Sequence, residues 1–519
     1  MVYMKSIPPP ADPPAEPNSR LRPGKTALFG LLLILILAAG VLLRFYNLSK
    51  QSYWMDEGYT VNAVLSVLEH GSTVLNSGQL YYCPLYCYPD AWLAHLFGAN
   101  AFDYRLLAVL AGIAFILAVY RIVSDLFSPG IGIAASFLTA FSYWQIAWSR
   151  QARWYTLFEL FLWLSLYLFY KALYGKGPRF WYAVSAAAAT ILAILASGLG
   201  YVLPVLFFIW FALDRIIRKK SLRWGLMGLA AALVLGGFAL WFAGLFPALV
   251  SLIKGIRPSY ELPYYLNFYL RTYWLFVPFA VFALFDAGAH YRKQIWFLLA
   301  AFIAYLIPLS FFTDIVQYRY LFAVTPVLLI LGAVGVSQAA RYFKRDWQKI
   351  SLWTAFVAVF LFIGGGVWHP TSYYFLESDN PSTLGPRPHY AYTPQPDWNG
   401  TYAYIETHVQ NGDIVISSMP QFNEIFLNEP GYWIAYNYLG LPGQPSISNS
   451  KESYVGAQVI KNLQGLQSLT ASRHGFIIFD YMAADGRMSQ DILQFIKTDL
   501  KEVFYENTNA YSQIWVYRF

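Results

Sequence analysis

Two adjacent carboxylates, Asp56 and Glu57, stand out in a chain that has few charged residues. They lie between aromatic residues in the stretch SYWMDEGYT, at residues 52–60. Neighbouring positions on a helix point about 100° apart, so the two could serve one site only in different roles. One could accept a proton from an attacking group, while the other orients a residue or holds a cation. Alternatively, both simply favour the start of a helix over residues 58–69 through the helix macrodipole.

Basic residues with aromatic neighbours form a second set of candidates. Arg150 and Arg153 lie one helical turn apart in SRQARWYTLFE, and Arg319 lies in QYRYLFAVTP. A guanidinium can bind a phosphate through two hydrogen bonds, so these arginines suit a lipid phosphate at headgroup level. Lys254 and Arg257 in SLIKGIRPSYELP add further positive charge. The alternative for Arg319 is ordinary interfacial anchoring.

Glu159 is a third acidic candidate, because it falls inside an apolar run. Ionisable groups within a membrane span are costly and usually face a protein interior or a wet cavity. The alternative is a structural ion pair of Glu159 with Arg150 or Arg153. Arg105 is expected to pair with Asp103, two residues before it.

The composition identifies the kind of protein that must position these groups. Hydrophobic residues make up 57% of the 519 residues and charged residues only 12%, about half the usual share of a soluble domain. Several runs of about 18 to 20 residues are nearly free of charge, which is enough to cross a bilayer. The net charge of +8 is spread over short loops, which argues against a nucleic-acid face. The chain is therefore predicted to be a polytopic α-helical membrane protein.

Eleven membrane spans are predicted, and basic residues gather in alternate connections between them. Examples are DRIIRKKSLR at residues 214–223 and RYFKRDWQK at residues 341–349. The positive-inside rule makes that side cytoplasmic, so the N-terminus is inside and the C-terminus outside the cell (plasma or inner) membrane. The spans are expected to begin near Thr26, Leu106, Ile131, Tyr155, Phe180, Tyr201, Trp224, Tyr273, Ile295, Leu321 and Leu352.

Four regions follow from the composition along the chain. Residues 1–25 are predicted to be a disordered cytoplasmic tail and residues 26–368 a transmembrane module. Its first extracytoplasmic loop covers residues 44–105, with helices near residues 59–69 and 86–97. Residues 369–396 read as a linker, and residues 397–519 as an extracytoplasmic soluble α/β domain. Only two cysteines occur, Cys83 and Cys87; we expect two free or packed thiols, with a disulfide as the geometrically awkward alternative.

The candidates together suggest a reaction class. Outward-facing carboxylates suit activation of a hydroxyl, cations suit a phosphate leaving group, and aromatic faces suit a sugar ring or an isoprenoid tail. An extracytoplasmic transferase could not use cytosolic nucleotide sugars, so a lipid-phosphate sugar is the logical donor.

The motifs resemble those of the GT-C membrane glycosyltransferases, especially the bacterial group related to protein O-mannosyltransferases and lipid A aminoarabinose transferases. RFYNLSKQSYWMDEGYT is similar to that group's opening pattern, CPLYCYPDAWLAHLFG to its first-loop helix, and FDYRLLAVLAG to the start of its second span. SRQARWYTL and RYLFAVTP resemble its later arginine motifs. The resemblance covers residues 44–340, and the order of the motifs makes it specific.

The resemblance implies a role for each candidate residue. Asp56 becomes the first candidate for the catalytic carboxylate and Glu57 the second. Arg153 and Arg319 become candidates for the donor phosphate, and Glu159 the nearest equivalent of a second family carboxylate. The donor would be a polyprenyl-phosphate sugar.

Two departures from the family pattern concern the acceptor. Residues 82–85 read Tyr-Cys-Pro-Leu where relatives often have His-Pro-Pro-Leu, and ASGLGY at residues 196–201 lacks a common histidine. These positions often touch the substrate, which points to a different acceptor.

The function expected is transfer of a sugar to a hydroxyl of a lipid glycan, polysaccharide or protein. No cofactor is certain, and a divalent cation (Mg²⁺ or Mn²⁺) is left open, since no His-rich or clustered Asp site is visible outside. Membrane lipids are expected partners and nucleic acid is not. The alternatives are a transporter or flippase of lipid-linked sugars, which would place charges near the bilayer midplane and show paired repeats, and a structural assembly factor without activity.

Overall fold

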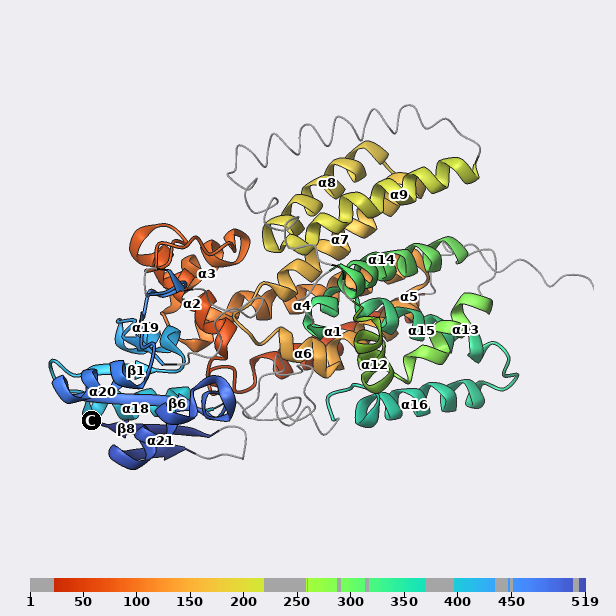
Figure 1. The fold of residues 1–519 in the computed structure, drawn as a ribbon. Helices are drawn as coiled ribbons and strands as arrows, with labels where there is room; N and C mark the ends of the chain where they lie inside the picture. The colour runs from red at the N-terminus through yellow and green to blue at the C-terminus, as the bar shows by residue number, and fades with distance from the viewer. Residues whose placement is uncertain are drawn as a thin grey trace, which may run out of the picture.

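The computed structural model has a bundle of apolar helices next to a mixed sheet (Figure 1). It describes residues 23–218, 258, 260–286, 291–312, 317–368, 396–434, 447–448, 451–506 and 513–519. The predicted tail lies outside these residues up to residue 22, and helix α1 already begins at Pro23. Of the predicted linker, only Pro396 is described.

Seven described helices are long and apolar enough to cross a membrane. They are α1 (Pro23–Phe45), α4 (Ala101–Leu126), α7 (Tyr155–Tyr174), α8 (Arg179–Ala196), η1 with α9 (Gly198–Tyr201 and Val202–Ile217), α14 (Arg292–Phe311) and α16 (Asp346–Ile363). Each matches one predicted span, because an uncharged run of this length satisfies its backbone internally only as a helix.

Three further predicted spans take irregular forms. The helix expected near Ile131 is the short α5 (Pro129–Phe141). Those near Tyr273 and Leu321 belong to bent pairs: α12 (Leu262–Thr272) with α13 (Phe276–Asp286), bent by 100°, and η2 (Tyr318–Val324) with α15 (Pro326–Ala340), bent by 50°. The span expected from Trp224 lies outside the described residues.

The first loop forms two helices, as predicted, α2 (Met55–His70) and α3 (Pro84–Phe97). The short helix α6 (Tyr143–Trp148) precedes α7. The expectation of free thiols is wrong, because Cys83 and Cys87 form a disulfide. Cys83 is the N-cap of α3 rather than a helical residue, and this conformation leaves the two Cα atoms 5.7 Å apart, within the usual disulfide range.

The C-terminal part contains an eight-stranded mixed sheet with the order β3-β4-β5-β2-β1-β6-β8-β7. Strands β5, β2, β1 and β6 are parallel neighbours, and the strands at both edges run antiparallel. The strands are β1 (Ile414–Ser417), β2 (Tyr432–Trp433), β3 (Ile447–Ser448), β4 (Lys451–Glu452), β5 (Gln458–Val459), β6 (Gly475–Asp480), β7 (Lys501–Glu506) and β8 (Ile514–Arg518).

Both faces of the sheet are covered, because alternate side chains of a strand point to opposite faces. Phe476 and Ile478 of β6 pack with α18 (Trp398–His408) and α19 (Pro420–Leu427). Ile477 and Phe479 pack on the other face with α20 (Leu463–Ser472) and α21 (Gln490–Asp499), and η6 (Ala483–Arg487) follows β6.

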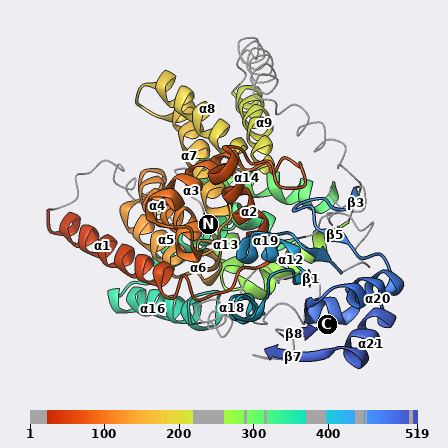
Figure 2. The same cartoon turned by 90° about the vertical axis from the view of Figure 1, so that its left-hand side faces the viewer.

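The sheet region is joined to the first loop by a shared core. Residues of α2 and α3 are buried in the same apolar cluster as those of α18 and α19, and α19 lies beside α2 in both views (Figures 1 and 2). Gly58 of α2 allows this close approach, since a Cβ there would lie 2.7 Å from the Gln421 side chain. Asn62 also donates to the Gln421 carbonyl over 3.0 Å. The first loop therefore has a fixed position between the helix bundle and the sheet.

Candidate active site

The first turn of α2 carries both adjacent carboxylates and points them in different directions. Trp54 is the extended N-cap residue, and its backbone N–H donates to Glu57 at 3.4 Å, which fixes the start of the helix. The side chain of Glu57 is 1% exposed and that of Asp56 is 17% exposed. Asp56 therefore reaches an open space that Glu57 does not.

Glu57 is held in a buried network with Arg105. The guanidinium donates to both carboxylate oxygens at 2.9 Å, and the backbone N–H of Ala152 donates to Oε1 at 2.7 Å. Arg105 also donates to the carbonyls of Leu48 and Gln51 at 2.8 and 3.0 Å. Glu57 thus ties the first loop to α4 and to the segment before α7.

The predicted pair of Arg105 with Asp103 is wrong. Asp103 lies in the first turn of α4 and accepts from Asn100, which caps that helix. Arg105 instead turns toward the first loop, where a fully buried carboxylate compensates its charge better than a residue on its own helix.

Asp56 faces two arginines from distant parts of the chain. Its Oδ2 lies 3.0 Å from Arg319 Nη1 and 3.6 Å from Arg153 Nη2. Both guanidinium groups also lie over the Trp54 ring, at 5.2 Å for Arg319 and 5.9 Å for Arg153. The site therefore combines one carboxylate with two cations that share an aromatic support.

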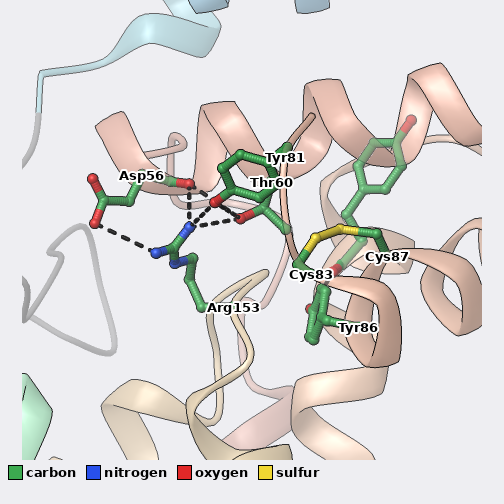
Figure 3. The surroundings of a disulfide bond; sticks show 8 residues. Asp56, Thr60, Tyr81, Cys83, Tyr86, Cys87 and Arg153 are labelled. Atoms are coloured by element: carbon green, nitrogen blue, oxygen red, sulfur yellow. Dashed lines mark hydrogen bonds and ion pairs between the residues drawn. A yellow bond between two sulfur atoms is a disulfide. The ribbon is translucent and has the colours of Figure 1, made fainter. Parts of the chain in front are cut away.

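Arg153 is fixed by α2 and by the segment before α3 (Figure 3). Its Nη1 donates to the Asp56 carbonyl at 3.0 Å, to Thr60 Oγ1 at 2.8 Å and to the Tyr81 hydroxyl. Burial lowers the pKa of Arg153, but the nearby Tyr81 and Asp56 raise it by more than burial lowers it. The pKa therefore lies above its ordinary value, and the guanidinium is charged. The alternative of an Arg153–Glu159 ion pair is therefore wrong.

A pocket of about 230 Å³ opens at this cluster. Asp56 is the one carboxylate among the described residues that line it. The lining residues are Met55, Asp56, Tyr59, Tyr81, Arg153, Trp154, Tyr155, Arg319, Tyr320 and Tyr454. An acid, two cations and several aromatic rings can bind a phosphorylated, hydroxyl-rich ligand.

A larger pocket of about 550 Å³ lies elsewhere, between α1, α5 and α16. Its described lining is mostly apolar and includes no charged side chain. The smaller pocket, with its charged lining, is therefore the candidate active site.

Several predicted site residues lie away from this pocket. Arg150 is 1% exposed and donates to the carbonyls of Leu43 at 3.1 Å and Arg44 at 3.4 Å, so it caps the end of α1. Glu159 is fully buried in α7, where Gln145 Nε2 donates to it at 2.7 Å. The structure therefore corrects the expectation that Arg150 faces a donor phosphate, and its alternative pairing with Glu159. Lys254 and Arg257 lie outside the described residues.

Five tyrosines line the pocket, and none was predicted as a site residue: Tyr59, Tyr81, Tyr155, Tyr320 and Tyr454. Tyr155 and Tyr320 lie close in the chain to the predicted Arg153 and Arg319. Tyr59 follows Asp56 by almost one helical turn, so the helical spacing could have identified it. Tyr81 and Tyr454 lie near Asp56 only through tertiary packing, and no local sequence signal marks them. In the described ranges, no three His, Cys, Asp or Glu side chains gather to hold a metal ion, and the suggested Mg²⁺ or Mn²⁺ stays a prediction.

A family model matches part of the chain. Residues 83–241 match the family model described as dolichyl-phosphate-mannose-protein mannosyltransferase. No curated protein sequence matches the chain.

Solved structures match over most of the chain. ArnT from Cupriavidus metallidurans bound to undecaprenyl phosphate superposes with a TM-score of 0.61 at 14% identity, covering 95% of this chain and 98% of that one. The oligosaccharyltransferase of Archaeoglobus fulgidus in its apo form superposes with a TM-score of 0.56 at 12% identity, covering 94% of this chain and 74% of that one. AglB from the same organism, in complex with an inhibitory peptide and a dolichol-phosphate, superposes with a TM-score of 0.55 at 12% identity, covering 94% of this chain and 74% of that one. The chain therefore has the GT-C fold of polytopic membrane glycosyltransferases, and the predicted resemblance to the mannosyltransferase and ArnT-like group is confirmed.

Proposed function

We propose that the protein is an integral-membrane glycosyltransferase that moves a sugar from a polyprenyl-phosphate donor to an acceptor hydroxyl. The observation that carries the proposal is the contact of Asp56 with Arg153 and Arg319 in one pocket. Two of the structurally similar proteins were solved with a polyprenyl phosphate: ArnT bound to undecaprenyl phosphate, and AglB in complex with an inhibitory peptide and a dolichol-phosphate.

The two arginines provide the phosphate site in this proposal. A lipid phosphate that enters the pocket competes with Asp56 for the guanidinium of Arg319, which is the nearer of the two. Arg153 is held by three hydrogen bonds from its Nη1 to oxygen atoms, while its Nη2 lies on the Asp56 side, in the pocket. Both charges then stabilise the phosphate as its bond to the sugar breaks.

Asp56 is the general base in this proposal. Once the phosphate has bound the two guanidinium groups in place of Asp56, the Asp56 carboxylate accepts the proton of the acceptor hydroxyl. The hydroxyl oxygen forms a bond to the anomeric carbon on the face opposite the phosphate. The bond between that carbon and the phosphate oxygen breaks, and polyprenyl phosphate leaves with the electron pair. The configuration of the sugar is inverted.

The membrane orientation belongs to the same proposal. The positive-inside pattern puts the first loop and the C-terminal region on the extracytoplasmic side of the cell membrane. On that side a lipid-linked sugar is the available donor. The acceptor would be a hydroxyl of a lipid glycan, a polysaccharide or a protein.

The test is sugar transfer by the purified full-length protein in lipid. Synthetic polyprenyl-phosphate sugars are supplied with the organism's own cell-envelope fraction, and release of polyprenyl phosphate is followed together with labelled product. We expect turnover in the wild type and a rate about 10²- to 10⁴-fold lower with Asp56→Asn. Movement of the labelled lipid across vesicles without any sugar transfer would contradict the proposal and support the flippase alternative.

A further inference from the structure

Among the described residues, the sheet region contributes one side chain, Tyr454, to the candidate active site. It lies in the turn between β4 and β5, almost four hundred residues after Asp56 in the chain. The turn is closed by a backbone hydrogen bond of 2.8 Å from the Glu452 N–H to the Ala457 carbonyl, and Gly456 has a positive φ of 80°. The hairpin is therefore shaped to place residue 454 at its tip.

Glu452 fixes the conformation of this turn. Its carboxylate is 1% exposed and accepts from the backbone N–H groups of Tyr454 and Val455, both at 2.8 Å. A buried carboxylate with two backbone donors is costly to misplace, because the donors would lose their partners. Glu452 is therefore a positioning residue for Tyr454.

Tyr454 meets Tyr59 of α2 at the pocket. The two rings are stacked, with centroids 4.3 Å apart and an interplanar angle of 29°. Both side chains are partly exposed and both line the pocket that contains Asp56. The stack thus joins the sheet region to the helix that carries the proposed base.

We propose that Tyr454 and Tyr59 form an aromatic platform that holds the sugar ring of the lipid-linked donor beside Asp56. This inference rests on the proposed function and adds a specificity-determining residue from the sheet region. Tyrosine has a flat apolar face and a polar hydroxyl. A sugar ring matches both, since it has C–H groups on its faces and hydroxyls at its edge.

The size and lining of the pocket favour a sugar over a lipid tail. At about 230 Å³ it is smaller than a usual drug-sized site, so it suits one ring. Its lining includes charged groups and tyrosine hydroxyls, which an isoprenoid tail would leave without hydrogen-bond partners. Arg153 and Arg319 account for the phosphate, so the tyrosines are free to contact the sugar.

The test compares binding of two kinds of lipid to the full-length protein by native mass spectrometry. One is bare undecaprenyl phosphate, and the other is a panel of undecaprenyl phosphates that carry mannose, glucose, galactose or 4-amino-4-deoxyarabinose. We expect the wild type to bind at least one sugar lipid more tightly than the bare lipid. Tyr454→Ala should reduce that preference about 3- to 10-fold and leave bare-lipid binding unchanged.

Two further variants keep the test independent of folding. Tyr454→Phe keeps the ring but lacks the hydroxyl, so it should retain most of the preference. Glu452→Gln leaves one turn N–H without its acceptor and should weaken the preference, as Tyr454→Ala does. Tyr505→Ala is the matched control, since Tyr505 is 41% exposed on β7, stacks on Trp515 and does not line the pocket. It should change neither binding constant.

Three results would overturn the inference. They are an unchanged preference in Tyr454→Ala, an equal loss for both kinds of lipid, and a wild type that prefers no sugar lipid. If the wild type transfers sugar and Tyr454→Ala keeps the wild-type preference for sugar lipids, the proposed function stands and only the aromatic platform is wrong. If the wild type transfers no sugar from any donor, the proposed function itself falls.

Discussion

Asp56 and Glu57 are neighbours in the chain, but their side chains lie in opposite environments, one open to a pocket and the other buried. Glu57 is buried, with both oxygens occupied by Arg105 and a third donor from the Ala152 backbone. Asp56 is partly exposed to a pocket and shares one oxygen with Arg153 and Arg319. The first environment is closed to any ligand, whereas the second lets a phosphate compete for the cations.

Two adjacent positions in the first turn of α2 therefore have different roles, one in stability and one in the proposed chemistry. Residues one position apart on a helix point about 100° apart, so one side chain enters the core while the next reaches the pocket. The buried pair fixes the first loop, and the loop in turn holds the exposed carboxylate in place. The two acids can therefore be distinguished by whether a substitution changes activity or stability.

The largest effect is expected from Asp56→Asn. It removes the proposed base while keeping the shape of the side chain, so sugar transfer should fall by about 10²- to 10⁴-fold. The thermal unfolding midpoint should stay close to that of the wild type, because the carboxylate is partly exposed. Initial rates of polyprenyl-phosphate release and unfolding in the same detergent check both points. Loss of folding instead of rate would contradict the role.

Glu57→Gln should instead destabilise the protein. The amide places an N–H₂ group against existing donors and leaves the charge of the buried Arg105 without compensation, a loss of about 3–5 kcal/mol. Denaturant unfolding of the detergent-solubilised protein measures the change. The paired variant Glu57→Gln with Arg105→Gln removes the unpaired charge and should recover part of the stability. Failure to recover any would mean that the ion pair is not the cause.

Arg319→Ala tests the cation side of the pocket. Removing the nearer guanidinium should lower transfer about 10²- to 10³-fold and weaken binding of bare polyprenyl phosphate. Arg150→Lys is the matched control, because Arg150 contacts carbonyls at the end of α1 and does not line the pocket. It should keep lipid binding while lowering stability. Equal binding losses in both variants would remove the distinction between them.

Glu424 gives the smallest effect, at the contact of α19 with the first loop. Burial, helped by the nearby Glu69, raises its pKa to about 7, although a hydrogen bond from Asn76 opposes this. A raised carboxyl pKa stabilises the protein below the unfolded-state pKa and loses that contribution as the pH rises through about 7. The thermal unfolding midpoint should therefore fall by on the order of 1–2 °C between about pH 5 and pH 8. Glu424→Gln should reduce this decrease, and an unchanged profile would exclude Glu424 as its source.

The sequence predicted most of the described membrane helices, because an uncharged run is a local signal. Uncharged runs identified α1, α4 and α7. The motif order also predicted the fold, which the structural matches confirm.

The side-chain partners were predicted less well, because they depend on packing between distant segments. Arg105 was assigned to Asp103 on its own helix, but it pairs with Glu57 from another. Arg150 and Glu159 share a motif with Arg153, yet only Arg153 reaches the pocket. Tyr454 comes from the far end of the chain, and a periodicity or motif within one segment gives no signal for such a contact.

The most direct test of the central claim is a comparison of transfer per folded molecule in Asp56→Asn and Glu57→Gln. Folded protein is isolated by size-exclusion chromatography at a temperature where both variants remain native, and initial rates are measured with the same polyprenyl-phosphate sugar. We predict that folded Glu57→Gln retains most of the wild-type rate and folded Asp56→Asn retains almost none. The reverse order, with Asp56→Asn active and folded Glu57→Gln inactive, would contradict the assignment of Asp56 as the base.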